Sequence, residues 1–294
     1  MNPIGSSELI LTPEGTIYHL NIRPDQIAKH VILVGDPDRV AVVSAHFDQI
    51  DHKVQHREFL THTGIYKNVP ISVVSTGIGT DNIDIVVNEL DALVNIDFAT
   101  RIVKEEKTSL NLVRLGTSGA IQRDISVGTI MASEFSIGFD GLMHFYAGSE
   151  NIREIEMEEA FISQTSWREH LARPYIVRSS NKLLKHLTFQ FETGINISSP
   201  GFYGPQGRQL RLALHDQELN HKIEAFRFKN YRITNYEMES SGIYGLAGLL
   251  GHEALTICAI IANRITLDFD SNYQVNISGM IEQTLDAIVN STEL

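Results

Sequence analysis

A continuous run of apolar β-forming residues, Val31 to Val34, constrains the fold of this chain more than any other feature. A strand without polar alternation is typical of a sheet that is covered on both faces. Further mostly apolar runs, at 69–75, 110–115, 128–132, 193–199 and 254–262, indicate strands of the same sheet. Helical spacing of apolar residues at 83–94 and 275–290 lies among them. The alternation predicts one α/β domain over residues 1–294, preceded within it by a polar arm at 1–30.

The remaining segments give weaker expectations. Residues 53–66 look strand-like, 133–150 look like an irregular glycine-containing loop, and 152–172 indicate a helix. The acidic face of that helix is expected to be solvated. Thr80 or Asp81 is expected to cap the helix at 83–94, and Ser179 to cap a short helix at 181–187.

Charge and cysteine content exclude several functions. The 24 basic and 36 acidic residues give a formal net charge of −12, so a nucleic-acid partner is not expected. The single cysteine, Cys258, lies in an apolar run and is expected to be a buried, inert thiol. Residues 1–8 do not resemble a signal peptide, and no apolar run approaches the ~20 residues that span a bilayer. We therefore expect a cytoplasmic protein without a membrane partner.

Three glycine-containing turns follow predicted strands. The first runs from Gly35 to Arg39, the second covers residues 76–82, and the third, Gly116–Gly119, follows Arg114. Glycine lets backbone N–H groups approach an anion, and ligands of open α/β sheets bind at the carboxyl ends of strands. The three turns are therefore expected to converge on one anion. Each turn alone is equally compatible with a plain strand-to-helix connection and a solvated arginine.

Two carboxylates mark a strand-to-helix corner at residues 235–242. If the chain is extended there, Glu237 and Glu239 point to one face, where they can accept hydrogen bonds from neighbouring sugar hydroxyls. The alternative is that they only complement the dipole of the helix that follows.

The segment 201–208 combines aromatic rings with amide and guanidinium groups. Phe202 can form a wall, while Gln206 and Arg208 offer the donors and acceptor that a planar base with carbonyl and N–H edges requires. An ordinary surface loop is the alternative.

Together these segments resemble the nucleoside phosphorylases, and most closely the uridine phosphorylase branch, from about His19 to Ile288. The resemblance rests on the motifs at 35–40, 114–120 and 235–240, in that order and spacing. It implies a mixed central sheet flanked by helices. It also implies a homodimer, or a hexamer built as a trimer of dimers, with active sites shared across the dimer interface.

The resemblance also assigns roles. Phosphate would be held by Gly35, Arg39, Arg114 and Thr117 of one chain and by Arg57 of its neighbour. Ribose would be held by Met238, Glu239 and, across the interface, His19; the base by Phe202, Gln206 and Arg208. Apart from the resemblance, a lone histidine in the polar arm, such as His19, is more often a surface residue than a functional one.

The resemblance implies no organic cofactor, with inorganic phosphate as co-substrate. The sequence shows no Cys/His cluster of the kind that binds zinc. Some relatives hold a monovalent cation, potassium, at the dimer interface, which here would lie near Glu58 and Ile78, although Asn82 stands where those relatives have Ser. The loop at 133–150 is longer than the resemblance leads us to expect, which points to a change in the site mouth or the oligomer.

The choice of base rests on two places. Purine-acting relatives carry an Asp after the last core strand, where this chain has Ala262-Asn263-Arg264, and pyrimidine-acting relatives carry the Gln-x-Arg found at 206–208. The expected reaction is uridine and phosphate to uracil and ribose 1-phosphate. The alternatives are a purine nucleoside phosphorylase, a nucleoside hydrolase, and a non-catalytic nucleoside-binding protein.

Overall fold

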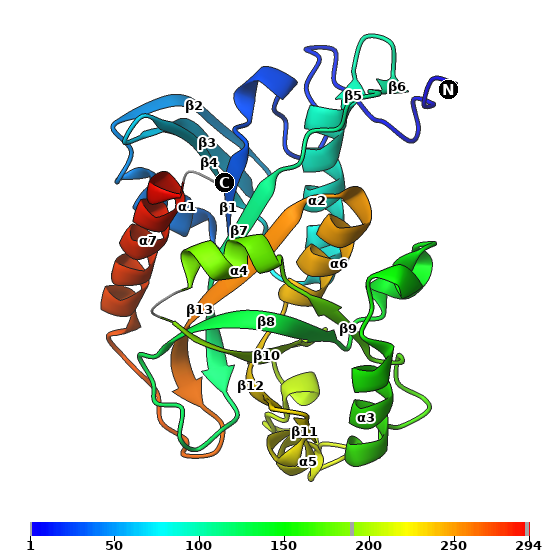
Figure 1. Ribbon diagram of the computed structural model, residues 1–294, viewed down its shortest axis with the longest axis vertical. Coiled ribbons are helices and arrows are strands. Elements are labelled where there is room, and N and C mark those ends of the chain that lie inside the picture. The colour runs from blue at the N-terminus through cyan, green and yellow to red at the C-terminus, as the bar shows by residue number, and fades with distance from the viewer. Residues whose placement is uncertain (1, 189–190, 292–293) are drawn as a thin grey trace.

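The computed structural model describes residues 2–188, 191–291 and 294, and a large twisted sheet organises them (Figure 1). The strand order is β11-β12-β10-β8-β13-β7-β1-β4-β3-β2, with β9 beside β8, and both parallel and antiparallel pairs occur. The sheet is therefore mixed, as expected. Its strands are β1 His30–Val34, β2 Gln49–His56, β3 Phe59–Tyr66, β4 Val69–Ser75, β7 Asn111–Ala120, β8 Ile130–Gly138, β9 Tyr175–Arg178, β10 Glu192–Ser198, β11 Arg227–Phe228, β12 Tyr231–Glu237 and β13 Glu253–Asn263.

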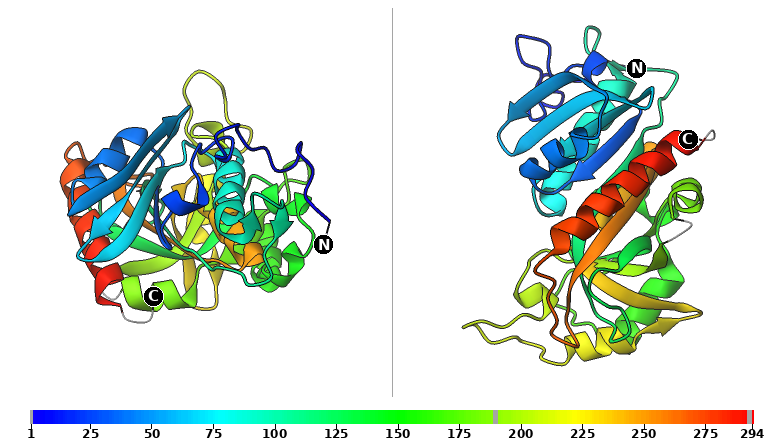
Figure 2. Two further views of the ribbon diagram at one scale, coloured as in Figure 1. Left: turned by 90° about the horizontal axis from the view of Figure 1, so that it is seen from above. Right: turned by 90° about the vertical axis from the view of Figure 1, so that its left-hand side faces the viewer.

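Helices cover both faces of this sheet (Figures 1 and 2). Val31 and Leu33 of β1 pack into one apolar core with α2 and α6, and Ile32 and Val34 pack into another with α1, α4 and α7. The expectation of a doubly covered sheet is thus confirmed. The helices are α1 Pro37–Ser44, α2 Thr80–Asn95, α3 Ile155–Thr165, α4 Asn181–Leu187, α5 Leu219–Ala225, α6 Ser240–Leu250 and α7 Tyr273–Asn290; the short strands β5 Ile96–Asp97 and β6 Ile102–Val103 form a separate pair.

Five strands close into a ring. Strand β12 pairs with β10 along one edge and, through Asn235 and Tyr236, with the end of β7 along the other. The ring β7-β13-β8-β10-β12 is thereby complete. Closure brings the 237–239 corner, which follows β12, beside the carboxyl-terminal half of β7, although the two are more than a hundred residues apart in the sequence.

Two expected loops are strands in the structure. The predicted turn at 116–119 is wrong, because β7 continues through it to Ala120, paired with β13. The irregular loop predicted from residue 133 begins only after β8 ends at Gly138. The strand-like stretch 53–66 is a hairpin of β2 and β3, with Arg57 and Glu58 at its turn.

Helix ends and one burial prediction also need correction. Helix α3 covers only 155–165, and its Glu158 is fully buried in an ion pair with Arg153 instead of being solvated. The first residue before α2 is Gly79, with no side-chain cap from Thr80 or Asp81. Helix α4 is capped by the hydroxyl of Ser180, not by Ser179.

Candidate functional site

A pocket of about 910 Å³ opens where β1, β4, β7, β12 and β13 end. Most of the residues predicted for the site line it, and they come from segments spread over more than two hundred residues of chain. These lining residues are Gly35, Arg39, Glu58, Ile78, Arg114, Thr117, Phe202, Gln206, Arg208, Met238 and Glu239.

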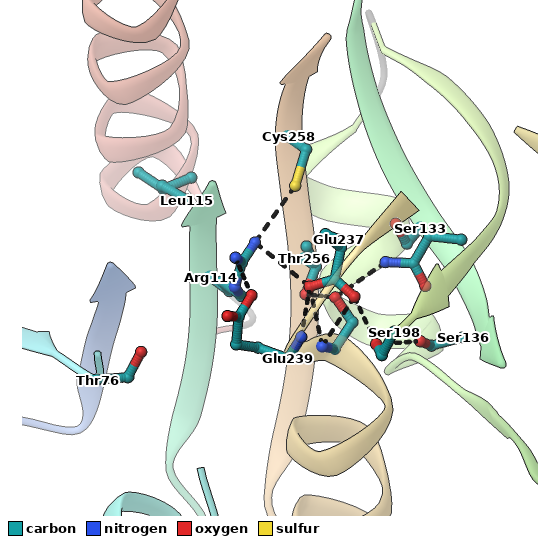
Figure 3. Close-up of polar contacts among 12 residues, drawn as sticks. Thr76, Arg114, Leu115, Ser133, Ser136, Ser198, Glu237, Glu239, Thr256 and Cys258 are labelled. Atoms are coloured by element: carbon teal, nitrogen blue, oxygen red, sulfur yellow. Dashed lines mark hydrogen bonds and ion pairs between the residues drawn. The ribbon is translucent and has the colours of Figure 1, made fainter. Parts of the chain in front are cut away.

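Arg114 lies on β7 and is almost completely buried. Its guanidinium donates a hydrogen bond to Glu239, lies 3.6 Å from Glu237 and donates to Cys258 Sγ at 3.3 Å (Figure 3). Gly116 makes room for it, because a Cβ there would lie 2.0 Å from Arg114 Nη1. The glycine expected to form a turn therefore serves as a cradle for the arginine two residues before it.

Arg39 lies in the first turn of α1 and faces the same pocket. Its Nη1 donates to Leu115 O at 3.4 Å, next to Arg114 along β7. Burial and the like charge of Arg114 lower the pKa of Arg39. Two guanidinium groups of like charge at the wall of one pocket form a site that an anion stabilises.

The two carboxylates of the 237–239 corner have different partners. Glu237 accepts hydrogen bonds from Ser198 Oγ, from Glu239 N at 3.0 Å and from Ser240 N at 3.0 Å, so it caps the start of α6. Glu239 accepts from Gly79 N at 2.9 Å and from Arg114. Burial raises the pKa of Glu239, against the lowering effect of Arg114. The helix-dipole interpretation thus describes Glu237, whereas Glu239 links the Arg114 cluster to the start of α2.

The segment around Gln206 forms a second polar cluster in the pocket. Gln206 is buried, and its Oε1 accepts from Arg208 Nη1 at 2.7 Å and from Arg264 Nη2 at 2.9 Å. The Arg208 guanidinium lies 3.5 Å from the centre of the Phe202 ring. Burial and the like charge of Arg264 lower the pKa of Arg208 to about 10. The segment is a largely exposed loop, as the surface-loop alternative has it, but Gln206 is buried within it and accepts from two arginines.

The sequence interpretation missed Arg264 as a site residue. It follows β13 directly, and Gly119 of β7 leaves space for it, since a Cβ there would lie 2.8 Å from Arg264 Nη2. Its Nε is buried without a hydrogen-bond partner in the described part of the chain. An arginine at the carboxyl end of a predicted core strand is the signal that also applies to Arg114, and applying it to the last strand would have found this residue.

Two predicted residues, His19 and Arg57, do not line this pocket. His19 Nδ1 lies 2.6 Å from Glu89, and Arg57 Nη2 donates to Tyr18 OH at 3.4 Å. The Arg57 guanidinium also lies 5.6 Å from the centre of the Tyr18 ring. Both side chains therefore belong to a patch formed by the arm and the β2–β3 hairpin, outside their own chain's pocket.

The predicted monovalent cation would lie near Glu58 and Ile78. Both line the pocket together with Asn82, whose amide lies so close to Gly77 that a Cβ there would be 2.3 Å from Asn82 Nδ2. Within residues 2–188, 191–291 and 294, no group of three or more His, Cys, Asp or Glu side chains could hold a metal ion. The cation stays a prediction.

None of the helices in the described ranges combines the length and the apolar character that crossing a membrane demands. The fold and the pocket define the class of protein. It is an α/β protein whose pocket opens at the strand ends of a mixed sheet and contains two pairs of arginines, Arg39 with Arg114 and Arg208 with Arg264.

Comparison with known proteins gives the family. The model of the phosphorylase superfamily matches residues 29–287. A uridine phosphorylase of Thermococcus kodakarensis is 32% identical over 266 residues, which cover 90% of this chain and 83% of the relative. A DeoD-type purine nucleoside phosphorylase of Clostridium perfringens is 27% identical over 277 residues, 92% of this chain and 98% of the relative. This chain belongs to the phosphorylase superfamily, among the nucleoside phosphorylases.

A solved structure supports the assignment. The Trypanosoma brucei nucleoside phosphorylase, described as showing uridine phosphorylase activity, superposes with a TM-score of 0.86 at 28% identity over 96% of this chain and 100% of that chain. A uridine phosphorylase of Phytophthora capsici, at 20% identity, 98% and 99% coverage and a TM-score of 0.69, shares the fold.

Proposed function

We propose that this protein catalyses the reversible phosphorolysis of uridine to uracil and ribose 1-phosphate, a pentosyl transfer in pyrimidine nucleoside salvage. The observation that carries the proposal is that one pocket contains both the Arg39–Arg114 pair and the Gln206 amide bridged by Arg208 and Arg264. The two cradling glycines, Gly116 and Gly119, lie three residues apart on β7, or about 10 Å along a strand. That separation suits a nucleoside with phosphate at one side and a base at the other.

The charges that develop on the sugar and the base during the reaction determine what each part of the pocket has to stabilise. A phosphate oxygen forms the new bond to C1′ while the C1′–N1 bond breaks, and the electron pair leaves with the base. The sugar passes through a state with oxocarbenium character, as in glycosyl transfer generally. The proton of hydrogen phosphate balances the negative charge left on uracil. The protein's task is to hold an anion beneath the sugar and to stabilise a second one on the base.

The residues in the pocket fit both tasks. Arg39 and Arg114 would grip the phosphate oxygens with planar donor pairs, assisted by Gly35 and Thr117. Arg208 and Arg264 would stabilise the charge that spreads to the carbonyl oxygens of uracil. Since Gln206 Oε1 is taken by both arginines, the amide N–H groups of Gln206 are its donors for the base.

The ribose would lie between these two groups. Glu239 would accept hydrogen bonds from its hydroxyls, Met238 would pack beneath the sugar, and Phe202 would form the wall beside the base. Each of these side chains lines the same pocket as the arginines.

The base end favours a pyrimidine over a purine. By the resemblance, purine-acting relatives carry their Asp where this chain has Ala262-Asn263-Arg264. Asn263 is buried, and its amide donates to Gln122 O at 2.9 Å and to Ile125 O at 2.8 Å. A side chain so engaged cannot deliver a proton to a leaving purine. Its neighbour in the pocket is a cation, Arg264, which suits the carbonyl edge of uracil.

We also propose that a second copy of the chain completes the site with Arg57 and His19. Their position outside their own pocket supports this arrangement. Three features stay predictions: assembly as a homodimer or hexamer, potassium binding near Glu58, and a cytoplasmic location.

The decisive experiment measures base release from uridine, inosine and adenosine, with and without phosphate. Release from uridine that requires phosphate is the expected result. Preference for inosine or adenosine would identify the purine alternative, and release without phosphate would identify a hydrolase. Binding of uridine without any release would show a non-catalytic binding protein. Arg39→Met is the matched control, because it removes one of the cations proposed to bind phosphate while leaving the Gln206 cluster intact.

A further inference from the structure

Asp140 lies in the segment that follows β8 and is not among the residues that line the pocket. Its carboxylate accepts hydrogen bonds from Ser241 Oγ at 2.9 Å and from Tyr175 OH at 2.8 Å, and it also accepts from Leu142 N at 2.8 Å. Ser241 belongs to the first turn of α6, two residues after Glu239, the ribose carboxylate of the proposed site. The segment therefore touches the helix that fixes Glu239.

Buried hydrogen bonds connect this contact with the site. Ser241 N donates to Ser198 Oγ at 2.9 Å. Ser198 Oγ in turn donates to Glu237 (Figure 3). Glu237 in turn accepts from Glu239 N at 3.0 Å. A continuous path of contacts thus runs from Asp140 to the backbone of Glu239. The side chains of all residues on this path, apart from Asp140, are buried.

The surroundings of Tyr175 fix its position in this path. It is fully buried on β9, opposite Gly138 of β8, where a Cβ would lie 2.3 Å from the tyrosine Cζ. Its hydroxyl donates to Asp140 at 2.8 Å and lies 3.0 Å from Ser241 Oγ. Burial and the Asp140 charge raise the pKa of Tyr175 well above its ordinary value, so it remains a hydrogen-bond donor at neutral pH.

The same segment also packs against α6 through apolar atoms. Met143 fills the space above Gly245, where a Cβ would meet its sulfur at 2.3 Å. Tyr146, by contrast, donates to Asp84 and so ties the segment to α2. The segment therefore has one polar attachment to the helix that carries the ribose carboxylate and a separate polar attachment to a different helix.

We propose that Asp140 is a positioning residue for ribose recognition, acting on Glu239 through Ser241 and Tyr175. The proposal rests on the proposed function, because it assigns Glu239 to the ribose hydroxyls. Without Asp140, the first turn of α6 loses the acceptor that two buried hydroxyls share, and the Glu239 carboxylate loses its fixed place beside Gly79. Discrimination for the full set of ribose hydroxyls should suffer first.

The test compares Asp140→Ala and Tyr175→Phe with the control Tyr146→Phe. The control also removes a tyrosine–aspartate contact of this segment, but one that ends on α2. For each protein, kcat/KM is measured for uridine and for 2′-deoxyuridine. The ratio of the two constants does not depend on the fraction of folded enzyme, so a merely structural role would not change it.

We expect the preference for uridine to fall by about fivefold or more in Asp140→Ala, and by less in Tyr175→Phe. It should stay at the wild-type value in Tyr146→Phe. An unchanged ratio in Asp140→Ala, or an equal fall in the control, overturns the positioning role. If wild-type protein releases no base from uridine, the proposed function fails instead.

A crystal structure of Asp140→Ala provides a readout that does not need activity. The Glu239 Oε1 to Gly79 N distance, 2.9 Å in the wild-type chain, should lengthen beyond hydrogen-bond range. Retention of that bond together with Arg114 in place would refute the path described here.

Discussion

Replacing Gly116 by alanine should displace Arg114, one of the two arginines proposed to bind phosphate, without disturbing the backbone. The new Cβ would lie 2.0 Å from Arg114 Nη1 and 2.7 Å from its Cζ. Ordinary van der Waals contact begins near 3.4 Å, so Nη1 must move by 3.4 − 2.0 = 1.4 Å. The backbone φ of Gly116 is outside the left-handed region, so alanine introduces no strain of its own. The guanidinium alone has to give way.

The size of the effect follows from that displacement. A misplacement of 1 Å in a catalytic group costs about a hundredfold in rate, or about 2.7 kcal/mol of transition-state stabilisation. Gly116→Ala should therefore lower kcat/KM for phosphate about a hundredfold in phosphorolysis of uridine. Steady-state kinetics with each substrate varied, together with the thermal unfolding midpoint, separate this loss from loss of folded protein.

Gly119→Ala is the matched control, because it lies on the same strand and crowds a different arginine. Its Cβ would lie 2.8 Å from Arg264 Nη2, so a movement of only 3.4 − 2.8 = 0.6 Å is required. The KM for uridine should rise modestly, while the KM for phosphate stays near its wild-type value. Wild-type kcat/KM in Gly116→Ala, or identical kinetic changes in the two variants, would refute the cradle argument.

Three further predictions concern single side chains. Glu239→Gln should raise the KM for uridine by about tenfold or more, because a hydrogen bond to a charged acceptor contributes about 1.5–3 kcal/mol; kinetics with unaltered KM would remove Glu239 from the ribose site. Arg208→Ala should lower kcat for uridine about 10²–10³-fold with little change in the unfolding midpoint, and unchanged turnover would withdraw its role at the base. Burial raises the pKa of the Cys258 thiol from 9.0 to about 11. The stability that this thiol contributes is therefore complete below pH 9 and is lost as the pH rises towards 11, by about 2.7 kcal/mol. Urea unfolding at pH 8 and 11 should show that loss in wild type and not in Cys258→Ala, and equal losses in both would contradict it.

The sequence was sufficient where the signal is local. The apolar run Val31–Val34 becomes a strand covered on both faces, and Pro37 begins the helix that carries Arg39. Strand periodicity and proline geometry act within a few residues, so no distant contact can reverse them easily. The carboxylates at 237 and 239 were also found, because a corner between strand and helix has a local pattern.

The sequence was insufficient where partners are distant. Gly116 and Gly119 suggested a turn, but closure of the strand ring extends β7 through them, and each glycine makes room for an arginine. Arg114 meets Glu239 across 125 residues, and Gln206 meets Arg264 across 58. The separate fates of Glu237 and Glu239 likewise depend on Ser198 and Gly79, which no periodicity of the 235–242 segment specifies.

Under the proposed function, the polar contacts of the pocket favour phosphate over water as the nucleophile. Arg114 is buried against Glu239, and removing one partner of a buried ion pair leaves an uncompensated charge that costs several kcal/mol. Under the proposed function, the ribose hydroxyls compete with Arg114 for Glu239. Arg39, whose pKa is lowered by burial and by the like charge of Arg114, lies at the same pocket. A neutral water molecule cannot compensate either cation. An anion bound by both arginines can, so in the proposed reaction the phosphate that balances the charge of the pocket is also the nucleophile.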